Sequence, residues 1–300
     1  MFGGNVFGWT IDEPTSFKLL DAFVATGFNF IDTAEGYSNW HPGNKGGESE
    51  TIIGKWLNQR GNRDRVVIAT KVGWWNIPAD NKGLSKSRIL QAAEGSLKRL
   101  QTDYIDLYQS HKDDPGTPIE ERLAAYDQLK KQGKIRAIGA SNYTADRLTE
   151  VLKISREKKL PRYESLQPLY NLYSRSEFET ELQPLCIKEN IGVITYSSLA
   201  SGFLSGKYRS ETDLSKSLRG FRVKKYLNGR GFRILAAVEE VAKEYRSTPA
   251  AVALGWLLSR PSITAPIASA TSLMQVEELI AATQLKLSPA SLELLNQASA

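Results

Sequence analysis

Short apolar runs alternate along the chain with longer stretches in which apolar residues recur every three or four positions. The short runs predict buried strands, and the longer stretches predict helices with one buried face. Seven strands are predicted, ending near Asp32, Lys71, Ser110, Ser141, Leu169, Ser197 and Ala268. Helices are predicted at about 14–26, 48–58, 85–100, 119–132, a stretch after 144, 178–189, 231–245, 249–258, 272–283 and 290–298. Strands that alternate with helices favour a parallel sheet, and about eight of them in 300 residues predict an α/β fold of the (β/α)8 TIM barrel class.

The first strand of such a barrel must precede the helix at 14–26, and few residues remain for it. The stretch from Met1 to Trp9 contains three glycines, Gly3, Gly4 and Gly8. Glycine in the interior weakens a strand. We therefore expect the first strand to be short or missing. Uncovered strand edges and apolar side chains would follow, and forming an oligomer is one way to cover them.

The composition is consistent with one large core. The chain has 300 residues, 41% of them hydrophobic, and no linker or low-complexity segment divides it, so we expect a single domain over 1–300. No run approaches the ~18 apolar residues of a membrane span, and the N-terminus does not read as a signal segment. The single cysteine, Cys186, has no partner for a disulfide. These features predict a cytoplasmic protein without a membrane partner.

The net charge of +6 raises the question of nucleic-acid binding. The lysines and arginines are scattered, however, and no patch interleaves basic with aromatic residues, so no nucleic-acid partner is predicted. A modest positive field also suits an anionic dinucleotide. His41 has no acid or second histidine at metal-ligand spacing, and no metal site is predicted.

Ionisable side chains stand at the ends of three consecutive predicted strands: Asp32 with the nearby Tyr37, then Lys71, then His111. Each alone has a simpler interpretation, as a turn cap, a loop aromatic, a solvated strand end or a surface histidine. The C-terminal ends of barrel strands meet at one rim, so the four would converge. Together they predict proton transfer, because a cationic lysine lowers the pKa of a neighbouring tyrosine and an acid keeps the lysine charged.

Five segments carry a resemblance to a known family: Asp32–Tyr37, Ala69–Lys71, Gln109–His111, Gly139–Asn142 and Tyr196–Tyr208. In these segments the chain resembles the aldo-keto reductase superfamily, in its bacterial and potassium-channel-β-subunit-like branch. The match runs in order over nearly the whole chain. It implies an NAD(P)H-dependent oxidoreductase that reduces aldehydes or ketones to alcohols. Resembling proteins begin with a hairpin that closes the barrel floor, and we do not expect this hairpin here.

The resemblance also implies roles for individual residues. Tyr37 would be the general acid, Lys71 with Asp32 would tune it, and His111 would orient the substrate carbonyl. Ser141, Asn142 and Gln167 are similar to residues that bind the nicotinamide carboxamide, and Tyr196 to the aromatic residue that stacks on the ring. Ser197 would be a further cofactor-binding residue. The backbone amides of Leu199, Ser201, Gly202 and Leu204, together with Lys207, would hold the pyrophosphate.

The adenosine end of the cofactor would meet Ser269, Thr271, Gln275 and Glu278. Relatives often carry lysine or arginine for the 2′-phosphate where this chain has Ser269, Thr271 and Gln275. A neutral side chain offers no charge, and charge-assisted hydrogen bonds are roughly twice as strong as neutral ones. The resemblance favours NADP(H), and NAD(H) remains open.

Two other functions are compatible with the same residues. One is a cofactor-binding regulatory or partner-binding subunit of the same fold, as in the channel-subunit relatives. The other is a Schiff-base aldolase that uses Lys71, which would leave Tyr196 and the 201–207 segment without a role. For the reductase, four tryptophans on predicted rim loops, Trp9, Trp40, Trp74 and Trp75, predict an apolar or aromatic small-molecule carbonyl substrate.

Overall fold

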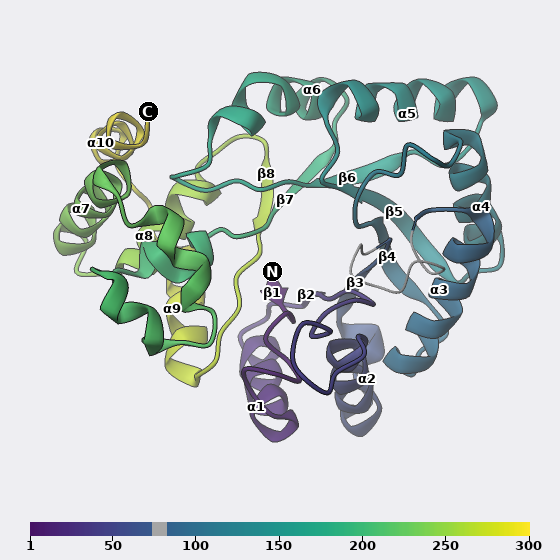
Figure 1. Ribbon diagram of the computed structural model, residues 1–300, viewed down its shortest axis with the longest axis horizontal. Helices are drawn as coiled ribbons and strands as arrows, with labels where there is room; N and C mark the ends of the chain where they lie inside the picture. The colour runs from purple at the N-terminus through teal and green to yellow at the C-terminus, as the bar shows by residue number, and fades with distance from the viewer. Residues whose placement is uncertain (74–82) are drawn as a thin grey trace. The chain divides into compact units, whose positions relative to one another are not determined.

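A computed structural model describes residues 1–73 and 83–300 of the chain (Figure 1). The predicted pocket tryptophans Trp74 and Trp75 lie outside the described residues. The strands are β1 (Phe2–Gly3), β2 (Phe30–Asp32), β3 (Val67–Val72), β4 (Ile105–Ser110), β5 (Ile135–Ser141), β6 (Tyr163–Gln167), β7 (Gly192–Thr195) and β8 (Ile263–Pro266). The helices are α1 (Glu13–Ala25), α2 (Glu48–Arg60), α3 (Lys86–Leu100), α4 (Ile119–Lys131), α5 (Ala145–Lys158), α6 (Gln183–Lys188), α7 (Gly229–Glu244), α8 (Pro249–Leu258), α9 (Leu273–Gln284) and α10 (Pro289–Ser299).

The internal contacts of the chain divide it into two compact units. The first unit comprises Met1–Gln167, Leu185–Gly192 and Ser269–Thr271, and the second comprises Pro168–Pro184, Val193–Ala268 and Ser272–Ala300. In the first unit, β1 to β6 pair in parallel in the order of the chain. In the second, β7 pairs in parallel with β8. Within the described residues, eight strands pair in parallel inside their units and alternate with helices along the chain, which confirms the predicted (β/α)8 barrel class.

The first strand is as short as the glycine-rich sequence predicts. β1 contains only Phe2 and Gly3, which pair with Ile31 and Asp32 of β2. The next residue, Gly4, continues against β2 by donating its amide hydrogen to the Asp32 carbonyl over 2.7 Å. A Cβ on Gly4 would lie 2.8 Å from Oγ of Ser49, so this close approach requires glycine.

Helices α2 to α5 follow one another around the strands of the first unit, each packing on the next (Figure 1). Local sequence sets where they begin: Ser85 and Thr144 accept hydrogen bonds from the backbone at the starts of α3 and α5. The contact between α2 and α3 depends on Gly54, where a Cβ would lie 2.1 Å from the carbonyl oxygen of Arg99. The two helix backbones therefore touch at this point.

The helix predicted at 178–189 differs in detail. A wide π-helical turn at Phe178–Leu182 precedes the short α6. Pro184 lies at the junction and has no amide hydrogen for the regular i to i−4 bond, which accounts for the irregular turn. On α6, Cys186 is buried, and this burial raises the pKa of its thiol to about 12.

Candidate active site

The centre of the site is a buried ion pair between Asp32, the last residue of β2, and Lys71 on β3. Nζ of Lys71 lies 2.6 and 2.8 Å from the two carboxylate oxygens of Asp32 and 2.7 Å from the carbonyl oxygen of Thr33. Lys71 is 0% exposed and Asp32 1% exposed. The Lys71 ammonium group therefore donates hydrogen bonds to the Asp32 carboxylate and the Thr33 carbonyl, and it has no contact with bulk water.

Burial and the ion pair act on the lysine in opposite directions. Desolvation lowers the pKa of Lys71, because a charged amine is disfavoured away from water. The carboxylate of Asp32, and at longer range that of Glu50, act to raise this pKa. Asp32 therefore favours the cationic form of Lys71, and this effect has the direction expected from the sequence.

Tyr37 reaches the same pair from the turn that follows β2. Its amide nitrogen donates to the Ala34 carbonyl over 3.1 Å, which closes the turn. Its hydroxyl accepts a hydrogen bond from Nζ of Lys71 over 3.0 Å and donates one to Oδ2 of Asp32 over 3.1 Å. The phenol is thus in direct contact with both charged groups.

Glu35, within the same turn, anchors it to neighbouring elements. Its carboxylate accepts from the amide of Gly73 over 3.0 Å and from Arg88 on α3 over 2.5 Å. Burial raises the pKa of Glu35, and Arg88 opposes that effect. Sequence reasoning missed this pair, although Glu35 lies inside the segment that carries the family resemblance. An acid between the small residues Ala34 and Gly36 is the signal that could have indicated it.

His111 follows β4 and completes the group. Its amide donates to the Val72 carbonyl over 2.8 Å, and its ring lies 5.9 Å from the ring of Tyr37, centroid to centroid. Burial, with the nearby Lys71 charge, holds the pKa of His111 well below its ordinary value. The imidazole is therefore neutral near pH 7 and can donate one N–H bond to a substrate oxygen. All four predicted residues come together.

The three residues assigned to the carboxamide lie beside this group. Oγ of Ser141 donates to the backbone carbonyl of Gln167 over 2.9 Å. Nδ2 of Asn142 donates to the His111 carbonyl over 2.9 Å and to Oγ of Ser141 over 3.1 Å. Nε2 of Gln167 donates to Oδ1 of Asp32 over 3.0 Å. Two predicted cofactor residues thus also support the proton-transfer residues, a link that the sequence did not reveal.

The second unit holds the residues assigned to the nicotinamide ring and the pyrophosphate. Tyr196 follows β7 and donates its amide hydrogen to the Pro168 carbonyl over 3.0 Å, and burial raises the pKa of its phenol to about 12. Ser197, Ser201 and Gly202 have left-handed backbone conformations, which curl this segment tightly. The amides of Gly202 and Leu204 donate to the Leu199 carbonyl over 2.8 and 3.2 Å.

Two of the four expected pyrophosphate donors are thus engaged within the turn itself. The side chain of Lys207 lies over the same turn, with Cε 3.6 Å from where a Gly202 Cβ would be. A lysine amine above a tight, small-residue turn is a suitable group for an anionic phosphate. The segment fits a dinucleotide through this lysine more clearly than through its amides.

The residues assigned to the adenosine end lie in both units. In the first, Oγ of Ser269 donates to Oδ1 of Asn5 over 2.8 Å, and Thr271 is exposed. In the second, the amide of Gln275 donates to Oγ of Ser272, which caps α9. Glu278 is half-buried on α9, and burial raises its pKa.

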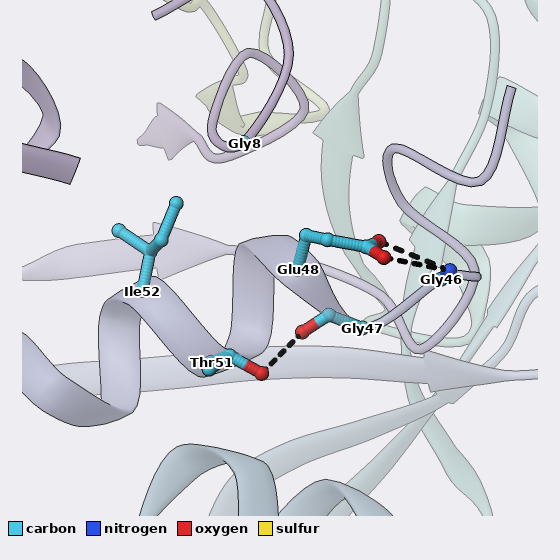
Figure 2. A pocket seen from close by; sticks show the side chains of 6 residues that line it. All are labelled: Gly8, Gly46, Gly47, Glu48, Thr51 and Ile52. Carbon is cyan, nitrogen blue, oxygen red and sulfur yellow. Dashed lines mark hydrogen bonds between the residues drawn. The ribbon is translucent and has the colours of Figure 1, made fainter. Parts of the chain in front are cut away.

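A pocket of about 240 Å³ opens on the first unit between the turn at Gly8 and the start of α2 (Figure 2). It is lined by Gly8, Gly46, Gly47, Glu48, Thr51 and Ile52. The carboxylate of Glu48 folds back onto the amide of Gly46, at 3.0 and 3.2 Å from its two oxygens. This pocket includes none of the four converging residues, so we do not assign the chemistry to it.

Within residues 1–73 and 83–300, no helix combines the length and the apolar character needed to cross a membrane. The same stretches contain no group of three or more His, Cys, Asp or Glu side chains placed to hold a metal ion.

Comparison with known proteins agrees with the geometry. The model of the aldo/keto reductase family matches residues 1–300. The uncharacterized oxidoreductase YrpG of Bacillus subtilis is 36% identical over 97% of this chain and 88% of its own length. A probable voltage-gated potassium channel subunit beta of Arabidopsis thaliana is 34% identical over 92% and 84%, respectively. The aldo-keto reductase YhdN of Bacillus subtilis is also 34% identical, over 92% and 81%.

Proposed function

Since the chain belongs to the aldo/keto reductase family of oxidoreductases, we propose that it reduces aldehydes or ketones to alcohols with a nicotinamide dinucleotide as reductant. The observation that carries this proposal is the hydrogen bond of 3.0 Å between Nζ of Lys71 and the hydroxyl of Tyr37. We also treat 1–300 as a single functional domain, which is the span of the family match.

The reaction needs a hydride for the carbonyl carbon and a proton for the carbonyl oxygen. The nicotinamide, when bound, supplies the hydride. Tyr37 supplies the proton: as negative charge develops on the substrate oxygen, the O–H bond of the phenol breaks and a new O–H bond forms on the substrate. The adjacent ammonium of Lys71 stabilises the phenolate that remains.

His111 and Asp32 prepare this transfer. The neutral imidazole donates a hydrogen bond to the substrate oxygen and so fixes the oxygen in reach of the Tyr37 hydroxyl. Asp32 keeps Lys71 charged in its buried position. Ser141, Asn142, Gln167 and Tyr196 are proposed to hold the nicotinamide, and Lys207 the pyrophosphate.

The test is Tyr37→Phe. We expect the variant to bind cofactor as before and to lose turnover by about 10²-fold or more. Tyr108→Phe is a matched control, because the buried hydroxyl of Tyr108 has no hydrogen-bond partner among the described residues. Turnover of a good aldehyde that is the same in both variants would disprove the role of Tyr37.

For the cofactor, we propose NADP(H) from the family, with NAD(H) as a close second. The adenosine-end residues Ser269, Thr271 and Gln275 are neutral, so the 2′-phosphate gains no ion pair from them. Quenching of tryptophan fluorescence by NADPH and by NADH gives both dissociation constants. A tenfold or greater preference for NADH would reverse the choice.

For the substrate, we propose an apolar or aromatic carbonyl. The rings of Trp9 and Trp40 pack edge to face with centroids 5.6 Å apart, and Trp40 lies 6.1 Å from the ring of Tyr37. An apolar wall beside the proton donor favours such substrates. A panel of aldehydes tests this, and faster turnover of small charged aldehydes than of benzaldehyde-type ones would contradict it.

A second candidate function rests on the similarity to the plant protein named as a probable channel subunit. A partner-binding subunit would retain its cofactor tightly and turn over too slowly for metabolism. The aldolase alternative requires an amine that a substrate can reach. Lys71 is 0% exposed, and its amine donates hydrogen bonds to Asp32, Thr33 and Tyr37. Borohydride trapping of a carbonyl compound on Lys71 would revive it.

A further inference from the structure

A chain of amide side chains leads from Asp32 into the interior of the first unit. Nε2 of Gln167 donates to Oδ1 of Asp32 over 3.0 Å and lies 3.5 Å from Oε1 of Gln109. Gln109 is on β4, is 0% exposed and pairs in register with Lys71 of β3. The two amides therefore form a polar layer directly against the buried ion pair.

The direction of each amide follows from the charge at its end. A carboxylate only accepts hydrogen bonds, so Gln167 must present its NH2 group to Asp32. The same nitrogen faces Gln109, which must then present its oxygen. As a result, the NH2 group of Gln109 points away from Asp32, and its two N–H donors need an acceptor elsewhere.

This nitrogen is one of two buried polar atoms without a partner on the two side chains that flank Gly139. Among the described residues, neither Nε2 of Gln109 nor Oγ of Ser165 has a hydrogen-bond partner, and Ser165 is only 6% exposed. Ser165 is two residues before Gln167 on β6, so both side chains lie on the same face of the strand. Buried donors without partners each cost about 1–3 kcal/mol, so native structures rarely leave two together.

Gly139 on β5 lies between the two residues and brings them together. It pairs in register with Gln109 on one side and with Ser165 on the other. A Cβ on Gly139 would lie 2.3 Å from Oγ of Ser165 and 3.1 Å from Cγ of Gln109, so both side chains occupy the space that any larger residue would fill. The strand pairing also shifts register between Ile138 and Gly139, a local bulge of the kind that re-aims side chains.

We propose that one water molecule is bound between Nε2 of Gln109 and Oγ of Ser165, as a fixed part of the polar chain that ends on Asp32. The two lone pairs of water match the two donors, an N–H of Gln109 and the O–H of Ser165. The water thereby holds Gln109 in the one orientation that lets Gln167 remain on Asp32. Gln109 and Ser165 are positioning residues, since neither touches the reacting groups.

A crystal structure at a resolution that shows ordered waters tests the site directly. We expect density within hydrogen-bond distance of both Nε2 of Gln109 and Oγ of Ser165. In Ser165→Ala and Gln109→Met this density should weaken or disappear. In Ser155→Ala, which removes a buried hydroxyl that instead donates to the Leu160 carbonyl, the density should persist.

Absence of density in the native protein, or a direct bond between Gln109 and Ser165, overturns the proposal. Unchanged density in both site variants also overturns it, because the two side chains would then not hold the water. If Gln109→Met does not fold, Ser165→Ala alone decides. These readouts need no turnover, so they stand or fall separately from the proposed reductase function.

A kinetic arm, which rests on the proposed function, measures the consequence for Asp32. We expect kcat of Gln109→Met to fall about five- to tenfold, the scale of one lost hydrogen bond. The dissociation constant for the dinucleotide should change less, because Gln167 is only one of several residues proposed to hold it. Equal effects on kcat and on cofactor binding would indicate a general structural role and would count against positioning of Asp32.

Discussion

Lys71 donates a hydrogen bond of 3.0 Å to the hydroxyl of Tyr37, and its Nζ also lies 4.7 Å from the centre of that ring. The amine therefore acts on both the oxygen and the π-face of the same phenol. A positive charge at this distance, shielded from water, favours the phenolate. We therefore expect proton transfer from Tyr37 to depend on the charge of Lys71.

Replacement of Lys71 by methionine should harm both stability and activity. The carboxylate of Asp32 would remain buried without a counter-ion, which costs about 3–5 kcal/mol in comparable pairs. Urea denaturation measures this loss. The double variant Asp32→Asn with Lys71→Met should recover much of the stability and none of the activity. If the double variant is as unstable as the single one, the ion pair is not the cause.

His111 should make stability depend on pH. Its pKa in the folded protein lies well below the ordinary value of 6.5, so below that pH the unfolded chain binds a proton that the folded chain does not. The contribution of His111 to the free energy of unfolding is therefore fully present above about pH 6.5, and it is lost as the pH falls below that value. Between about pH 7.5 and 5.5 the native protein should lose about 1.4 kcal/mol more than His111→Gln. Urea denaturation of both proteins at the two pH values measures these losses. Equal losses of stability in the two proteins would refute the role of His111.

The Glu35–Arg88 pair predicts a pH effect of the other sign. In Arg88→Met the buried carboxylate loses the partner that opposes the rise in its pKa. A carboxyl group with a raised folded pKa binds a proton more readily when folded, so its contribution to stability is present at low pH and lost as the pH rises through that pKa. The variant should be about 3–5 kcal/mol less stable than the native protein at about pH 8, and less so at about pH 5. A pH-independent difference would contradict this account.

Gly54 should be among the least replaceable glycines. In Gly54→Ala the new methyl would press on the carbonyl oxygen of Arg99, part of the α3 backbone, and the helices must separate. We expect a loss of about 3 kcal/mol or more in the free energy of unfolding. Gly27→Ala is the matched control: it has a φ of +88° but nothing within 4 Å, so only backbone strain of about 1 kcal/mol applies. Similar losses in the two variants would show that helix packing at Gly54 is loose.

The parts of the molecule that depend on sequence pattern were predictable. Apolar runs gave all seven well-defined strands, and the strand ends carried Asp32, Lys71 and His111 to one place because parallel strands share an edge. The three glycines near Met1 gave the two-residue β1. These features depend on residues that are close together in the chain, so the sequence pattern alone reveals them.

The parts that depend on register were not predictable. The hydrogen bond from Gln167 to Asp32 joins residues 135 positions apart. To predict it, one must know the register of every strand pair between β2 and β6. The same holds for Gly139, whose neighbours on both sides come from pairing alone. The direction of the amides in the pyrophosphate segment was not predictable for another reason. A sequence does not show where an amide points, and the amides of Gly202 and Leu204 turn toward the Leu199 carbonyl.

The burial of Cys186 has a practical consequence for experiments on this protein. Reagents such as maleimides react with thiolates, and a thiol with a pKa of about 12, sheltered on α6, is almost wholly protonated at neutral pH. Cys186 is also the only cysteine in the sequence. A cysteine introduced at an exposed position should therefore accept a fluorophore or spin label selectively, with Cys186 left in place. Cofactor association could then be followed on otherwise native protein.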